Sequence, residues 1–308
     1  MQRIQATRTL QGTTVAGLIH NGGQYFYVQV EIYEDGTFDC WERVDLAGVQ
    51  EKIHSGWLVS SVPAGQTLSI HGLGAYRLKQ AEWLYDAKRY VQHLLEKVKE
   101  LNPHMLNVYT MPEDTDDNAF ISKRSPFSAG KPIRDIGTGL RKPVEGKGFH
   151  LLKRTDAKVS LVELVLYANG SAVLYEGAEE HEYSPWEKVL EHIDQGILCT
   201  QLKPQSEVHI PDLGTITVEE TLYDVDVSEK RQELIDEMNA LQGKETSLEA
   251  CRQAYIDYLI DPNKWARQRL KEAYEKVPEH LRMYLGSMDD KDSDYVRIID
   301  RPHEKREV

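Results

Sequence analysis

The sequence predicts an α+β fold: two repeated ββαββ units with small antiparallel sheets, each backed by a helix, and a C-terminal helical extension. Two observations support this prediction. Residues 28–78 and 162–218 carry the same order of apolar, turn and glycine residues, and both segments alternate strand-like runs with one short amphipathic stretch. A small sheet must cover one of its faces, so each unit needs a further helix. The predicted domains are 1–109, a linker over 110–147, 148–243 and 244–308.

The repeat is carried by residues that form turns and cores. Tyr33 and Gly36 correspond to Tyr167 and Gly170 in the second copy. After a short insertion near 176–184, six more positions match: Ile53, Gly56, Leu58, Ile70, Leu73 and Gly74 with Ile193, Gly196, Leu198, Ile210, Leu213 and Gly214. The repeat therefore predicts how the chain is built rather than what chemistry it performs.

A β-hairpin opens the first unit. Residues 25–33 are rich in β-branched and aromatic side chains, which favour a strand. Glu34–Gly36 predicts a tight turn because Asp-Gly tolerates positive φ, and 37–43 is the return strand. A short helix then ends at Gly56. Strands at 67–70 and 75–78 follow, and the covering helix is predicted at 80–101.

The second unit repeats this order. Ser184 and Pro185 suit the N-cap and the first position of its short helix, and Gly196 suits the helix end. The predicted strands are 161–167, 172–175, 208–210 and 215–218, and the predicted covering helix is 228–241.

Residues from 246 onward read as helices. Thr246 and Glu249 fit a capping box, and Asp261-Pro262 fits an N-cap followed by a first-turn proline. Tyr295–Ile299 is predicted as a late strand that adds to one of the sheets.

Composition limits the function classes. The net charge of −13 disfavours nucleic acid and anionic membranes as partners and suits a basic protein. Three cysteines without a CxxC pair, no apolar signal segment and no membrane-length apolar run predict a cytoplasmic protein with reduced thiols.

The sequence offers no established catalytic or cofactor motif. Its histidines and cysteines lack zinc spacing, and 114–118 and 290–294 begin like calcium loops but lack the required glycine and closing glutamate. The glycines near 137–148 lack the strand and helix that a phosphate-binding loop requires. We therefore expect no catalytic residue, no cofactor and no metal.

Two sets of residues are candidates for contacts. The linker from 123 to 147 holds seven basic and two acidic residues, and its candidate anion or partner contacts are Lys123, Arg124, Lys131, Arg134, Arg141 and Lys142. This stretch binds either an anionic partner or the acidic surface of its own chain; the second is favoured because it costs no translational freedom.

The second set is a candidate interface. Trp41 and Trp57 belong to an aromatic-rich first half, and tryptophan concentrates at binding hot spots. Glu51 and Glu191 are the one charged position common to both copies. Such a glutamate either keeps a short helix soluble or contacts a cationic partner.

The motif Ile-x-x-Gly-x-Leu followed by Ile-x-x-Leu-Gly, and the tail KVPEHLRMYLGSMDDKD, resemble uncharacterised bacterial cytoplasmic families of tandem small α+β domains. Two functions remain open. The first is a non-catalytic protein-interaction module, such as a bacterial immunity or defence accessory protein that binds a basic partner. The alternative is an enzyme or small-ligand binder that uses a cleft between the two repeats.

Overall fold

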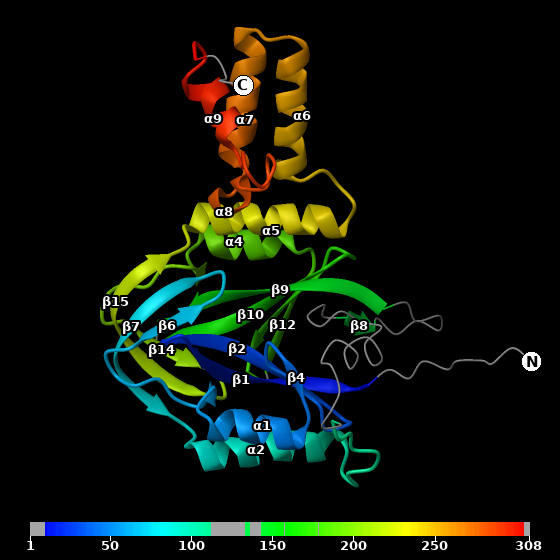
Figure 1. Ribbon diagram of the computed structural model, residues 1–308, viewed down its shortest axis with the longest axis vertical. Coiled ribbons are helices and arrows are strands. Elements are labelled where there is room, and N and C mark those ends of the chain that lie inside the picture. Colours follow the sequence, from blue (N-terminus) through cyan, green and yellow to red (C-terminus); the bar gives the residue numbers. More distant parts are fainter. Residues whose placement is uncertain (1–9, 112–132, 136–142, 157, 178, 305–308) are drawn as a thin grey trace, which may run out of the picture.

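The computed structural model describes residues 10–111, 133–135, 143–156, 158–177 and 179–304, with the backbone alone at 133–135 and 143. The fold is α+β, as the sequence predicts. A large, mostly antiparallel sheet carries helices on its outer faces, and a helical unit projects from one end (Figure 1).

The first half contains most of its strands before its long helix. Its elements are β1 Gly12–Asn21, β2 Gln24–Tyr33, β3 Phe38–Asp39, β4 Arg43–Val44, α1 Leu46–His54, β5 Leu58–Val59, β6 Thr67–Ile70, β7 Gly74–Trp83 and α2 Ala87–Leu101.

The second half follows the same general order, and helices alone come after it. Its elements are β8 Ile133–Asp135, β9 Pro143–Arg154, β10 Val159–Tyr167, β11 Ala172–Glu176, β12 Glu179–Tyr183, α4 Glu187–Asp194, β13 Leu198–Cys199, β14 Glu207–Ile210, β15 Gly214–Asp224 and α5 Val227–Leu241. The C-terminal helices are α6 Ser247–Ile260, α7 Lys264–Lys276, α8 Glu279–Arg282 and α9 Ser293–Asp300.

Strand pairing is the same in the two halves. In the first half, β1 pairs antiparallel with β2 and β5, β2 pairs parallel with β6, and β6 pairs antiparallel with β7. The second half repeats these pairings. There, β9 pairs antiparallel with β10 and β13, β10 pairs parallel with β14, and β14 pairs antiparallel with β15. Antiparallel pairing between β7 and β15 joins the two halves into one sheet.

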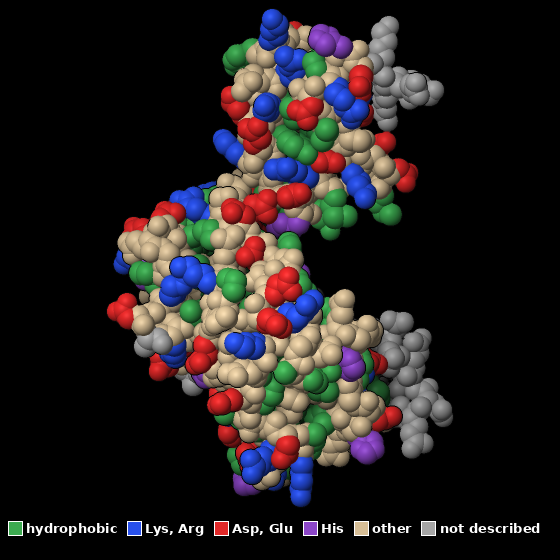
Figure 2. Space-filling view, turned by 90° about the vertical axis from the view of Figure 1, so that its left-hand side faces the viewer, with side chains coloured by type: hydrophobic (Ala, Val, Ile, Leu, Met, Phe, Trp, Pro, Cys, Tyr) green, Lys and Arg blue, Asp and Glu red, His purple; other side chains and the backbone are tan. Residues whose placement is uncertain are grey.

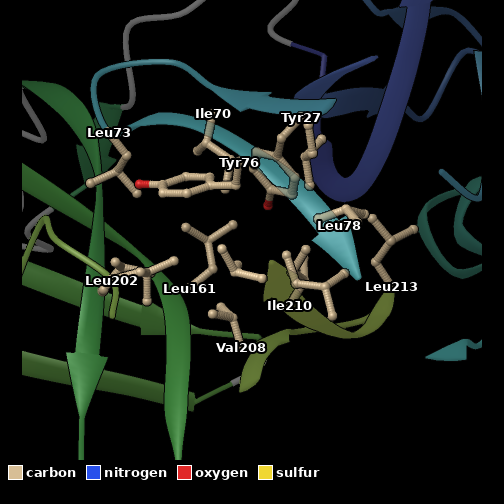
Figure 3. Packing of buried hydrophobic residues seen from close by; sticks show 14 of the residues in the cluster. Tyr27, Ile70, Leu73, Tyr76, Leu78, Leu161, Leu202, Val208, Ile210 and Leu213 are labelled. Atoms are coloured by element: carbon tan, nitrogen blue, oxygen red, sulfur yellow. The ribbon is translucent and has the colours of Figure 1, made fainter. Parts of the chain in front are cut away.

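The halves bury their inner faces against each other. α1 and α2 lie on one side of the molecule and α4 and α5 on the opposite side, with the strands between them (Figure 1). A hydrophobic cluster fills the space between the halves, and Tyr76 and Leu78 of the first half meet Leu161 and Ile210 of the second (Figure 3). Separate clusters lie beneath the helices of each half and inside the C-terminal unit.

The repeated turns are built by the same hydrogen bonds. The Asp35 side chain accepts bonds from the backbone and hydroxyl of Thr37, at 3.1 and 2.7 Å. Asn169 accepts the equivalent pair from Ser171, at 3.1 and 2.8 Å. The glycine that follows each acceptor has positive φ, as the predicted hairpin turns require.

The two longest strands outside the sequence prediction are β1 and β9. β1 and β9 pair with β2 and β10 along nearly their full length. Their glycines lower the strand propensity, and a glycine in each packs closely against a tyrosine ring of the partner strand: Gly12 against Tyr33 and Gly146 against Tyr167. β9 begins at Pro143, inside the range predicted as linker.

The predicted return strand over 37–43 is interrupted. Only Phe38–Asp39 pairs with β2, and Arg43–Val44 forms a separate short strand. Trp41 lies between them with φ of 71°, in the left-handed region, which a regular strand cannot contain.

Three predicted helix starts are wrong. Residues 80–83 belong to β7, and α2 begins after Asp86, whose side chain accepts a hydrogen bond from the backbone of Arg89 at 2.8 Å. Helix α4 begins after Trp186 rather than Ser184. Helix α7 is capped by Asn263 rather than Asp261. The predicted capping box of Thr246 and Glu249 is present.

The predicted strand at 295–299 is helix α9. Tyr295 and Ile298 are buried in the C-terminal core at a spacing of three residues, which puts them on one helix face. Arg297 pairs with Asp294 at 3.2 Å with the same spacing. None of the helices in the described ranges has the length and apolar composition that a bilayer span requires.

Candidate functional site

The structure brings the two predicted interface tryptophans into contact. The rings of Trp41 and Trp57 meet edge to face with centroids 6.3 Å apart, and the Phe26 ring lies 5.3 Å from that of Trp41. Trp41 is 58% exposed, which is unusual for so large an apolar side chain. Its left-handed backbone costs roughly 1–2 kcal/mol for a residue with a side chain.

Charged groups border these rings. The Lys52 ammonium lies 4.2 Å from the centroid of the Trp57 ring and forms an ion pair with Glu42. Glu51, on the same helix as Lys52, is exposed. We call Phe26, Trp41, Glu42, Lys52 and Trp57 the Trp41 surface.

The second half lacks an aromatic side chain at two of these three aromatic positions. The backbone bond from His20 to Trp57 recurs as the bond from Arg154 to Ile197, both at 2.8 Å, so Ile197 occupies the position of Trp57. By the same correspondence, Ser160 occupies the position of Phe26. The scaffold therefore does not require aromatic residues at the positions of Phe26 and Trp57.

The other predicted contact residues are not brought to this surface. Glu191 is exposed on α4, which lies on the opposite side of the sheet from α1 (Figure 1). The basic residues Lys123, Arg124, Lys131, Arg141 and Lys142 lie outside the described residues. Arg134 is described only as backbone, in β8, opposite Val144 of β9. On the face in Figure 2, acidic and basic side chains are interspersed, so net charge alone marks no binding surface there.

A polar cleft of about 400 Å³ lies between the two halves, beside the hydrophobic cluster. Residues of β1 and β2 line one side and residues of β10 and β11 the other, with Gly177 and the β14–β15 turn at its border. The polar side chains in its walls include Thr14, Gln29, Glu163 and Asp212. We call this space the cleft.

Glu163 is an acidic residue in the wall of the cleft, and the pKa of its carboxyl is shifted. Burial raises the pKa of Glu163, and the nearby charge of Glu31 raises it further. Next to it, Gly148 leaves room for the carboxyl, because a Cβ at that position would come within 2.8 Å of Glu163 Oε1.

Tyr27 lies in the wall of the cleft as a neutral phenol. Burial raises the pKa of Tyr27, and the charges of Glu163 and Asp212 raise it further. Gln29 donates a hydrogen bond to the Tyr27 hydroxyl at 3.0 Å. The Tyr27 proton therefore remains available for donation to an acceptor.

His150 faces Glu163 across the β9–β10 pair. Burial lowers the pKa of His150 to about 4, so its ring is neutral near pH 7. The ring meets Tyr27 edge to face at 5.2 Å, and its Nε2 has no hydrogen-bond partner among the described residues. In the first half, Ala16 and Gln29 occupy the corresponding pair of positions.

Within the described part of the chain, one cluster has potential metal-ligating atoms. Glu176, Glu179 and His181 place one ligand atom each within 4.8 Å of one another. Lys153 and Lys158 already pair with Glu176, at 2.8 and 2.9 Å. Burial alone would raise the pKa of Glu176, but these lysine bonds outweigh it and hold the pKa at about 2. Two ammonium groups at the carboxylate make this a poor cation site.

The three cysteines have the character of inert core residues. Cys40, Cys199 and Cys251 are buried and unpaired. Burial raises the pKa of all three thiols, to about 12 for Cys40 and Cys251. A thiol with so high a pKa is a weak nucleophile near pH 7.

The family model described as Domain of unknown function (DUF7638) matches residues 1–105 and 140–245, more than half of the chain. The chain belongs to this family. The two DUF7638 segments correspond to the two halves of the sheet and their helices. The model described as Domain of unknown function (DUF7639) matches residues 246–307, the C-terminal helical unit. These matches confirm the expected resemblance to uncharacterised families. No curated protein and no solved structure matches the chain.

Proposed function

We propose that this DUF7638 protein is a non-catalytic interaction module that binds a basic protein through the Trp41 surface. The observation that carries the proposal is the exposed Trp41, held with left-handed backbone in contact with Trp57. Strained backbone at an exposed aromatic residue costs stability, and such strain concentrates at binding and switch regions.

The charges around Trp41 indicate the chemistry of the partner. Glu42 and Glu51 are exposed, while Lys52 is already engaged with Glu42 and the Trp57 ring. An arginine of a partner would stack on the free face of Trp41 and pair with one of these carboxylates. A bacterial immunity or defence accessory role would suit such a module, with a basic toxin-like protein as partner.

We further propose that the two halves are copies of one ββαββ unit with its covering helix. The matching turn bonds, helix-end glycines and strand pairings support this duplication. Within it, Phe26 and Trp57 have no aromatic counterpart in the other copy, which supports a role in recognition rather than in folding.

The test is affinity capture from the source organism with three baits: wild type, Trp41→Ala and Trp265→Ala. Trp265 is a matched control, since it is 68% exposed and belongs to the C-terminal unit. We expect a stoichiometric basic protein with the wild-type and Trp265→Ala baits, and its loss with Trp41→Ala and at high salt. Truncation of a hot-spot tryptophan costs about 2 kcal/mol or more, or roughly 30-fold in Kd.

Two results would contradict the proposal. One is repeated capture without any stoichiometric partner. The other is loss of the partner with Trp265→Ala but not with Trp41→Ala, which would move the interface to the C-terminal helices. Trp41→Gly provides a folding control, because glycine adopts the same φ without steric cost and should retain full stability while losing the partner.

A small-ligand or enzymatic role remains the alternative. The joint between the halves is largely apolar, but the cleft lined by Glu163 lies beside it. His150 is not among the residues that line the cleft, so Glu163 and His150 do not form a shared acid–base site there. The cleft therefore favours binding over catalysis.

A further inference from the structure

The cleft has the size and position of a small-molecule site. Its volume of about 400 Å³ falls in the range of roughly 300–1,000 Å³ typical of ligand pockets. Both halves contribute polar groups to it: Thr14 and Gln29 from the first, Glu163 and Asp212 from the second. It lies apart from the Trp41 surface, whose residues do not line it.

The cleft contains negative charge without a balancing cation. Among the described residues, no lysine, arginine or histidine forms an ion pair with Glu163, and the charge that shifts its pKa is another carboxylate, Glu31. Asp212 adds a further carboxylate at the border. A carboxylate withdrawn from water without a partner is destabilised, and a cation placed beside it removes that penalty.

The polar groups of the cleft include several hydrogen-bond acceptors. The amide NH₂ of Gln29 donates to Tyr27, which leaves the Gln29 carbonyl oxygen as an acceptor. The hydroxyl of Thr14 and the two oxygens of Glu163 add further acceptors. A ligand with several N–H donors matches this set, whereas a hard divalent ion would need about six oxygens converging at one point.

We propose that the cleft binds a small organic cation, with an ammonium or guanidinium group paired to Glu163. The comparison between the halves supports this assignment. The equivalent of Glu163 is Gln29, and the equivalent of Gly148 is Thr14. The second half therefore carries both the carboxyl and the glycine that gives it room, while the first half carries neutral groups.

The proposal is tested by calorimetric titration of the full chain with agmatine at low salt and pH 8. Agmatine carries both a guanidinium and an ammonium group. We expect saturable binding by the wild type and about 10- to 100-fold weaker binding by Glu163→Gln, which keeps the shape but removes the charge. Glu219→Gln is the matched control, because Glu219 is exposed on β15 and does not line the cleft. It should bind agmatine like the wild type.

Two further titrations separate this proposal from the alternatives. Trp41→Ala should bind agmatine unchanged, so a failure of the Trp41 surface proposal leaves this one intact. A short arginine-containing peptide identifies the alternative source: binding of the peptide that depends on Glu163, without binding of agmatine, would overturn the small-cation assignment. No saturable binding of agmatine to the wild type, or equal binding to Glu163→Gln, would also overturn it.

Discussion

The two halves share their scaffold and differ in side chains at the cleft, at the surface and beneath the covering helices. Asp35 and Asn169 make the same pair of turn bonds, and Asp86 and Asp226 cap the equivalent covering helices. Where the halves differ, side chains of different chemistry occupy the same backbone. The comparison teaches that the turn and cap positions are kept in both halves while other positions accept side chains of different chemistry.

The covering helices show that even a buried position can hold side chains of different chemistry in the two halves. Tyr90 of α2 is fully buried and donates a hydrogen bond to the backbone of Ala16 at 2.9 Å. Lys230 occupies the corresponding position of α5, where it is 2% exposed and pairs with Glu233 at 2.6 Å. A buried phenol and a buried ammonium, which pairs with a partly exposed carboxylate, thus fill the same position.

The largest expected effect tests whether the halves are one cooperative unit. Leu94→Ala and Leu234→Ala remove equivalent core side chains, which are 1% and 0% exposed. Each should lower the free energy of unfolding by about 2–5 kcal/mol. Because β7 and β15 pair and a core cluster joins the halves, urea unfolding by circular dichroism should show the same transition shifted in both variants.

Tryptophan fluorescence would reveal the opposite outcome. Trp41, Trp57 and Trp83 report on the first half, Trp186 on the second and Trp265 on the C-terminal unit. If Leu94→Ala destabilised only the first half, the fluorescence and circular dichroism transitions would separate, and the halves would be independent domains.

An intermediate effect concerns the charge difference between Gln29 and Glu163. Since the folded pKa of Glu163 is raised, the folded state binds its proton more tightly than the unfolded state does. The free energy of unfolding of the wild type therefore falls as the pH rises from 4.5, the pKa of this carboxyl in the unfolded state, through its higher pKa in the folded state. Glu163→Gln has no carboxyl to titrate and does not lose this stability. Its free energy of unfolding should therefore exceed that of the wild type at pH 8, and the difference should disappear near pH 4.

Glu219→Gln is the control for that pH series and should show no such dependence. A Glu163→Gln variant that was less stable than the wild type at pH 8 would mean that the carboxylate has a stabilising partner. Added agmatine should reduce the advantage at pH 8, because it stabilises the wild type in preference.

The smallest expected effect tests whether the acceptors in the two hairpin turns are interchangeable. Asp35→Asn and Asn169→Asp exchange the two acceptors, and each should change the free energy of unfolding by less than about 1 kcal/mol. Asp35→Ala should cost more, about 1–3 kcal/mol, because it leaves the buried Thr37 donors without that acceptor. An Asp35→Asn variant as destabilised as Asp35→Ala would show that the charge itself is required.

The sequence predicts the repeat, the hairpin turns and most helices, because glycine and turn residues act locally. It does not predict β1 and β9, whose glycines weaken the strand pattern. Nor does it predict the cleft. Gln29 and Glu31 alternate with apolar residues in β2, which is the pattern of a strand with one face in water. That face instead lies toward the second half, which is distant in sequence, and local periodicity carries no information about this contact.

The β7–β15 pairing has a consequence for how this molecule can vary. In a symmetric dimer, a substitution appears in both subunits, so a carboxyl at the position of Glu163 would be accompanied by a second one. With both halves in a single chain, the equivalent position holds the neutral Gln29. Because the two halves are covalently linked, the cleft can have two unlike walls. Such a cleft can bind an asymmetric ligand in one orientation.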